Sequence, residues 1–138
     1  MRYDGKVYFL IRRTEDASIC VYPTKYLKHK TTSNRSPNTV KRIAFSLSYF
    51  MGYLKEQGRQ FEDVYEMTYS AQMEFFQNFL YWVKGGKHIS GEVRKIPDNG
   101  TCNAYLHDVF GFYQFLEMEY EQFGSLLVLS DKPRSARF

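Results

Sequence analysis

The sequence predicts a mainly α-helical protein, a compact bundle of about four helices preceded by a short β-hairpin. Apolar residues recur every three or four positions in residues 37–57, 69–83 and 101–119, which is the period of a helix packed along one side. Residues 6–12 and 18–22 are short runs rich in β-branched and aromatic residues. The length of 138 residues and the hydrophobic content of 43% are typical of one soluble globular domain.

The hairpin is expected close to the N-terminus. Residues 6–12 and 18–22 would be its strands, with the turn Thr-Glu-Asp-Ala between them. Because two strands are marginally stable alone, we expect the hairpin to pack against the bundle or to belong to a module completed elsewhere. Residues 23–30 are then expected to form a short helix.

The helix over residues 37–57 has clear start and stop signals. Ser36 can cap its first turn, Pro37 suits its first position, and Gly58 is a natural stop. Its apolar residues fall on one stripe, which comprises Val40, Ile43, Ala44, Leu47, Phe50, Met51 and Leu54.

Two further helices are expected beyond it. Thr68 or Ser70 caps the helix over residues 69–83, which is apolar most of the way round and is therefore predicted to be central. The last helix is predicted from Thr101 to Glu119. Between them, residues 84–100 form a loop of a length that is usually functional or disordered.

Charge is unevenly distributed along the chain. The formal net charge is +4, and residues 23–59 hold eight Lys or Arg against one acid, Glu56. The acids cluster at residues 62–66 and 117–121. This segregation predicts a basic surface that attracts polyanions. The alternative is a basic face that is only solvated.

Catalytic and metal-binding patterns are not found. The three histidines have no metal-ligand spacing, and Cys20 and Cys102 form no Cys-x-x-Cys pair, so we expect no metal, no cofactor and free thiols in a reducing cytosol. The first residues lack the apolar run of a signal peptide, and no segment is long and apolar enough to span a bilayer. We therefore expect an intracellular protein with no membrane partner and no active site.

Two helices begin with similar residues. Ser-Pro-Asn-Thr occupies 36–39, and Asn-Gly-Thr-Cys-Asn occupies 99–103. Each places a hydroxyl and an amide at a helix N-terminus, where free N–H groups and the helix dipole favour an anion. Plain capping is the alternative interpretation. The basic residues around both starts favour two phosphate sites.

Both stretches resemble signature helices of the core-binding domain of tyrosine recombinases, the phage-integrase family. The first match comprises Ser36, Pro37, Asn38, Thr39, Lys41, Leu47, Phe50, Tyr53 and Leu54. The second comprises Thr101, Asn103, Leu106, Val109, Phe112, Tyr113, Phe115 and Leu116. The two motifs occur in the family's order, and the resemblance covers about residues 23–120.

The resemblance implies a SAM-like, DNA-binding helical bundle that forms half of a C-shaped clamp around a recombination site. The other half would be a catalytic domain with an Arg, a His-x-x-Arg and a nucleophilic Tyr. No His-x-x-Arg occurs here, so we expect no catalytic residue in this chain. The expected segments are a hairpin over 1–22, the core-binding domain over 23–126 and a basic linker over 127–138.

The implied partners are double-stranded DNA, the catalytic domain of the same parent chain and other recombinase protomers. The implied location is cytoplasmic, on a bacterial or phage-type nucleoid. The candidate DNA-binding residues are Ser36, Asn38, Thr39, Lys41, Arg42, Lys55, Lys87, Arg94, Lys95, Thr101, Asn103 and His107. Asn38, Arg42, Asn103 and His107 are the candidates for base edges. The candidates for phosphates are Thr39, Lys41, Arg42, Lys55, Thr101 and the cations of residues 84–95.

The sequence departs from the family pattern in the second helix, where Ala104, Tyr105, His107 and Phe110 occupy positions that are often basic or polar in the family. Tyr105 and Phe110 would lie against DNA, contact a neighbouring protomer or pack within the bundle. Two other functions stay open: an aromatic-rich protein-interaction module, and a small enzyme, for which no group of convergent ionisable residues is found.

Overall fold

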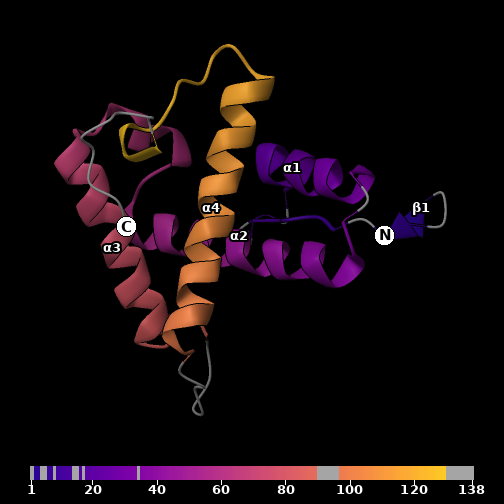
Figure 1. Cartoon of the computed structure of the whole chain (residues 1–138), viewed down its shortest axis with the longest axis horizontal. Coiled ribbons are helices and arrows are strands. Elements are labelled where there is room, and N and C mark those ends of the chain that lie inside the picture. The colour runs from indigo at the N-terminus through magenta and orange to yellow at the C-terminus, as the bar shows by residue number, and fades with distance from the viewer. Residues whose placement is uncertain are drawn as a thin grey trace. The chain divides into compact units, whose positions relative to one another are not determined.

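The computed structural model describes residues 2–3, 6–7, 9–13, 16, 18–33, 35–89 and 97–129, and shows a mainly α-helical protein (Figure 1). The helices are α1 (Val21–Thr32), α2 (Pro37–Gln57), α3 (Tyr69–Lys84) and α4 (Asn99–Glu119), with short 3-10 helices η1 (Phe61–Glu66) and η2 (Leu127–Leu129). The sequence-based bounds of α2 and α3 are thus confirmed to within one residue. Within the described residues, no helix has both the length and the apolar character needed to cross a membrane.

The chain divides into two compact units, Met1–Ser48 and Tyr49–Phe138. The boundary falls inside α2, so the first half of this helix belongs to the first unit and the second half to the second. We call them the first and second unit below and describe each one separately.

The hairpin predicted over residues 6–12 and 18–22 is not supported. Two-residue strands, β1 (Arg2–Tyr3) and β2 (Lys6–Val7), pair antiparallel with each other. Residues 11–13 and 18–20 meet only at one isolated antiparallel bridge, between Arg12 and Ile19.

The predicted second strand ends because helix α1 begins at Val21. Pro23 has a fixed φ suited to the first helical turn and no N–H for a β-ladder. The N–H of Thr24 already donates to the carbonyl of Cys20 (3.1 Å). The short helix expected over 23–30 is therefore present, and it is longer than expected.

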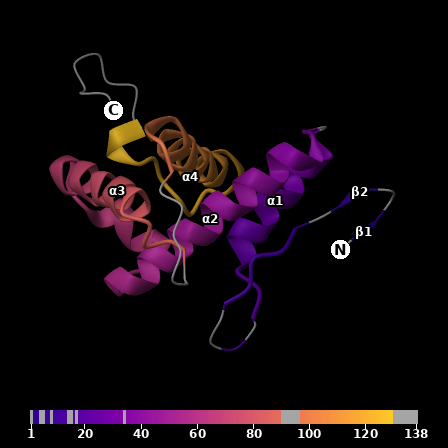
Figure 2. The ribbon, with the colours of Figure 1, turned by 90° about the horizontal axis from the view of Figure 1, so that it is seen from below.

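The first unit is built around α1 and the first half of α2. Figures 1 and 2 both draw α1 alongside this part of α2, and the two helices are consecutive in the chain. The N–H of Ile11 donates to Thr24 Oγ1 (3.2 Å), which ties the preceding segment to α1. Buried apolar side chains of this unit are Ile11, Cys20, Tyr26, Leu27, Val40, Ile43 and Leu47.

Local signals set the ends of α2. The Ser36 hydroxyl oxygen accepts a hydrogen bond from the Thr39 N–H (3.2 Å), which confirms the predicted cap. At the other end Gly58 has a φ of 68°, and the N–H of Arg59 donates to the Leu54 carbonyl (2.9 Å). Glycine terminates the helix here because it has no Cβ and therefore adopts this left-handed backbone conformation without strain.

Aromatic rings form the core of the second unit. The Phe50 ring lies 5.4 Å from Phe79 and 6.0 Å from Tyr113 between centroids, and both contacts are edge-on. Two buried hydroxyls are satisfied by backbone carbonyls: Tyr53 donates to Phe75 (2.7 Å) and Tyr113 to Phe61 (2.9 Å). Edge-on ring pairs stabilise a fold by more than the burial of their apolar area alone. The many aromatic residues of this chain therefore contribute directly to the packing of the core.

Helix α3 is less enclosed than its composition predicts. Phe76, Phe79 and Val83 are buried, but Tyr81 on the same helix is 69% exposed. One buried position of α3 is polar: Gln72 donates from Nε2 to the carbonyl of Val64 (2.9 Å), which lies in η1. The helix therefore has a packed face and an open face.

The start of the predicted linker is packed in the second unit. Leu126 and Val128 are buried, and the Val128 N–H donates to Gln72 Oε1 (3.2 Å). Residues 127–129 thus form a helical turn held on α3. Residues 130–138 of the predicted linker lie outside the described residues.

Candidate nucleic-acid interface

The two units differ in charge. The first contains ten Lys or Arg and three Asp or Glu, whereas the second contains nine and twelve. No acidic residue occurs between Asp16 and Glu56. The basic surface expected from the sequence therefore belongs mainly to the first unit, and the second unit is acidic by sequence.

Helix α1 carries an exposed basic stripe that we define as Lys25, Lys28 and His29. These positions are three and four residues apart, so they share one face of the helix. All three residues are exposed, whereas Tyr26 and Leu27 on the opposite face are buried. The buried face holds α1 in the first unit and leaves the basic face to solvent.

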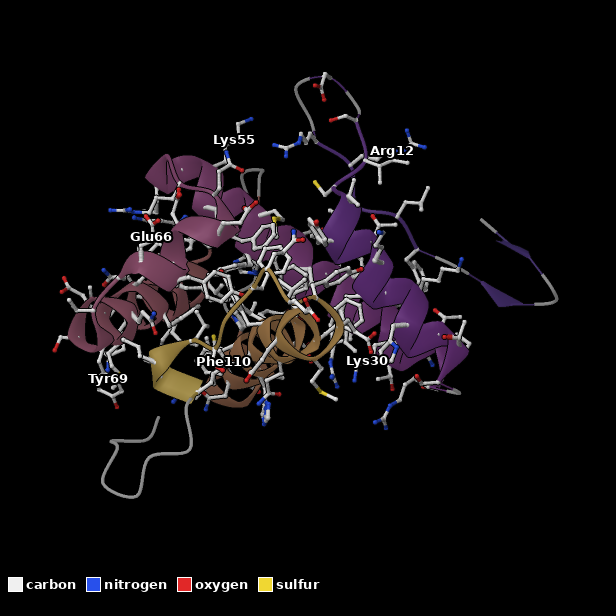
Figure 3. The ribbon with its side chains drawn as sticks, turned by 90° about the horizontal axis from the view of Figure 1, so that it is seen from above. Arg12, Lys30, Lys55, Glu66, Tyr69 and Phe110 are labelled. Atoms are coloured by element: carbon white, nitrogen blue, oxygen red, sulfur yellow. The ribbon has the colours of Figure 1, made fainter. Side chains whose placement is uncertain are left out.

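Lysines of α1 also lie over tyrosine rings. The Lys30 Nζ atom is 5.4 Å from the centre of the Tyr26 ring, and Lys25 Nζ is 5.8 Å from that of Tyr22. Lys30, labelled in Figure 3, is partly buried. Such contacts attract an ammonium group to the face of an aromatic ring.

The start of α2 is a cap whose hydroxyls are paired. The Ser36 hydroxyl donates to Thr39 Oγ1 (2.9 Å) while its oxygen accepts from the Thr39 N–H. Ser36 and Asn38 are exposed and Thr39 is partly exposed. The start of α2 was expected to be either a plain helix cap or a phosphate site, and the geometry shows the cap. A phosphate bound here would have to share the Thr39 N–H with the Ser36 hydroxyl oxygen.

Beyond the cap, α2 presents a mixed stripe to solvent. Lys41 and Arg42 are exposed directly after the first turn, and Phe45 is 48% exposed one turn further on. Ser48 continues the exposed face, while Val40 is buried on the other side. The candidate residues Asn38, Lys41 and Arg42 are therefore brought together on one accessible surface.

The start of α4 differs from the prediction. The helix begins at Asn99 and its cap is Asp98, whose Oδ1 accepts a hydrogen bond from the Thr101 N–H (2.7 Å). Thr101 is thus the third residue of the helix. Hydrogen bonds from Thr101 lower the pKa of the Asp98 carboxyl, so a negative charge already occupies this helix start.

Asn103 and His107 are exposed on α4, four residues apart and hence on one face. Lys55 in the last turn of α2 and Lys87 after α3 are also exposed. Arg94 and Lys95 lie outside the described residues. The candidates of the second unit are therefore spread over several elements, in contrast to the grouped candidates of α2.

Tyr105 and Phe110 pack against other rings of the second unit. The Tyr105 ring lies 5.3 Å from Tyr49, and the Phe110 ring, labelled in Figure 3, lies 5.0 Å from Phe76. Both rings therefore pack within the bundle, which was one of the alternatives beside contact with DNA or with a neighbouring protomer.

His88 joins this ring cluster. Its centroid is 4.6 Å from Tyr49 and 6.2 Å from Tyr105. Its Nδ1 atom is buried and has no hydrogen-bond partner among the described residues. Burial lowers the pKa of His88, which favours the neutral ring. Among the described residues, no group of His, Cys, Asp or Glu is arranged to hold a metal ion.

The sequence reasoning missed the stripe of α1 as a candidate site. Lys25 and Lys28 were counted in the basic block, and the spacing of Lys25, Lys28 and His29 on an expected helix was the available signal. His88 was also missed, because its partner Tyr49 is remote in sequence.

Comparison with models of known protein families, with curated proteins and with solved structures finds no match to this chain.

Proposed function

We propose that this chain is a DNA-binding module, the SAM-like core-binding domain of a tyrosine recombinase or integrase. One observation carries the proposal: a stretch from Asp16 to Glu56 without any other acid forms two helices that expose Lys25, Lys28, Lys41 and Arg42. A surface of one sign attracts the phosphate backbone of a duplex.

The pattern of burial supports the family resemblance. In the 36–54 motif the apolar positions Leu47, Phe50 and Leu54 are buried, while Ser36 and Asn38 are exposed. In the second motif Leu106, Val109, Phe112, Tyr113, Phe115 and Leu116 are all buried. The motif residues thus separate into core positions and surface polar positions, as a DNA-contacting helix requires.

In this proposal the chain clamps duplex DNA at a recombination site and the chemistry belongs to a catalytic domain of the parent protein. Lys41, Arg42 and Lys55 contact phosphates and supply affinity. Asn38, with Asn103 and His107, is placed on exposed helix faces from which side chains reach base edges in a major groove. The Thr101 backbone N–H is engaged by Asp98 and contributes least.

The test is a titration of the chain with a fluorescein-labelled DNA duplex of mixed sequence, over a series of salt concentrations. We expect weak binding whose log affinity falls by roughly 0.9 per log unit of salt for each phosphate neutralised. Affinity that does not change between low and physiological salt would contradict the proposal.

The second candidate is an aromatic-rich protein-interaction module, favoured by the exposure of Tyr81 (69%) and Met118 (82%) in the second unit. Amide chemical shifts recorded during the duplex titration separate the two functions. DNA binding predicts shifts around residues 36–42, whereas shifts confined to residues 110–127 would favour the interaction module.

A further inference from the structure

We infer that α1 is a second DNA-contacting helix, in which Lys25 and Lys28 bind phosphates of the same duplex that the start of α2 contacts. This inference rests on the proposed function and deepens it. Neither lysine belongs to the recombinase-like motifs, which begin at Ser36.

The first argument is position. Lys25 and Lys28 are exposed on one face of α1, and a connection of residues 33–36 leads from the end of α1 to the start of α2. Arg35 in this connection is exposed too. The exposed cations Lys25, Lys28, Arg35 and Lys41 therefore all belong to the first unit.

The second argument is charge. The nearest acids in sequence to this surface are Asp16 and Glu56, so α1 and the first half of α2 contain no carboxylate of their own. The start of α4 has the opposite character, because the Asp98 carboxylate caps it. Phosphate attraction is therefore stronger at α1 than at the α4 start, where the sequence motif placed it.

The third argument concerns the kind of polyanion. A helix that binds a membrane surface needs a free apolar face beside its basic face. Tyr26 and Leu27 of α1 are buried in the first unit, which leaves Val21 at the start of the helix as its exposed apolar residue. The exposed neighbours on α1 and α2 include Asn38, whose amide group suits hydrogen bonds to DNA. The arrangement fits a duplex better than a lipid surface.

The experiment measures the salt dependence of duplex binding for three forms of the full chain. They are the unaltered chain, the double variant Lys25→Gln/Lys28→Gln, and the control Arg59→Gln/Lys84→Gln. The control removes the same charge from exposed positions of the second unit that are not proposed contacts. Circular dichroism verifies folding, and the single reversal Lys28→Glu provides an independent variant of the same surface.

We expect the slope of log affinity against log salt to fall by about 1.8 in the α1 double variant, since each phosphate contact contributes roughly 0.9. The control should keep the original slope, and Lys28→Glu should weaken binding. An unchanged slope in the α1 variant, or an equal change in the control, overturns this inference and leaves the proposed function standing.

Two further outcomes count against the inference. If the unaltered chain does not bind the duplex, the proposed function and the inference both fail. If the chain instead binds phosphatidylserine-containing vesicles through Lys25 and Lys28, and phosphatidylcholine vesicles do not bind, the surface is a lipid site and the inference is wrong.

Discussion

The Asp98 carboxylate accepts a hydrogen bond from the Thr101 N–H, with Oδ1 and N 2.7 Å apart, and thereby closes the first turn of α4. Asn caps helices about as well as Asp, whereas Ala cannot accept this bond. We therefore expect Asp98→Ala to lower the thermal midpoint more than Asp98→Asn does at neutral pH, measured by circular dichroism.

The same pair of variants tests the interface. Removal of the Asp98 charge should leave the salt slope of duplex binding unchanged if phosphates do not approach the start of α4. A clear gain in affinity for Asp98→Asn would show that phosphates lie beside Thr101, where we expect the weakest attraction because of the Asp98 charge.

Lys41→Ala combined with Arg42→Ala should lower duplex affinity without unfolding the chain. Both side chains are exposed on α2, so their removal costs contacts with DNA and little packing. The expected loss of salt slope is about 1.8 if each contacts one phosphate. The exchanged variant Lys41→Arg/Arg42→Lys keeps both charges and should keep the slope. Full affinity in the alanine variant would exclude the start of α2 from the interface.

Gln72→Met should destabilise the protein strongly. Gln72 is completely buried and joins the Val64 carbonyl, through Nε2, to the Val128 N–H, through Oε1. Methionine has a similar shape but leaves the buried Val128 N–H unpaired, at a cost of about 1–3 kcal/mol, and also removes the side-chain bonds to the Val64 and Met67 carbonyls. Urea unfolding measures the change, and Gln77→Met, at an exposed position of the same helix, is the matched control. Equal midpoints for the two variants would contradict this assignment.

The stability of the protein should fall on mild acidification, through His88. Its pKa in the fold is lowered by burial from the ordinary 6.5, so the unfolded chain takes up a proton first as the pH falls through 6.5. The free energy of unfolding should therefore decrease below about pH 6.5 and level off below the pKa of the folded state.

Urea unfolding at about pH 7.5 and about pH 5 checks this expectation, with His88→Leu as the comparison. The Leu variant retains an apolar side chain among Tyr49, Trp82 and Tyr105 but cannot titrate. A pH effect of the same size in both chains would assign it to other groups.

Local sequence signals predicted α2 and α3 well because their ends depend on neighbouring residues. Ser36 and Thr68 cap helices that start one residue later, and Gly58 provides the left-handed stop. The hairpin failed for a local reason too, since residues 21–22 of its expected second strand lie in α1, where Pro23 suits the first turn and has no N–H for a β-ladder. At α4 the cap is Asp98, an acid three residues before the predicted start at Thr101, and its carboxylate changes the charge of a candidate site.

By itself, the sequence determined the helical class, the ring-rich core and the excess of basic residues before Glu56, because periodicity and composition act over a few neighbouring residues. Only the tertiary structure decided which polar residues are buried. Gln72 and His88 appear as ordinary polar residues in the sequence, and their partners Val128 and Tyr49 are many residues away. Burial and hydrogen bonding between remote segments depend on how the helices pack, and no local pattern contains that information.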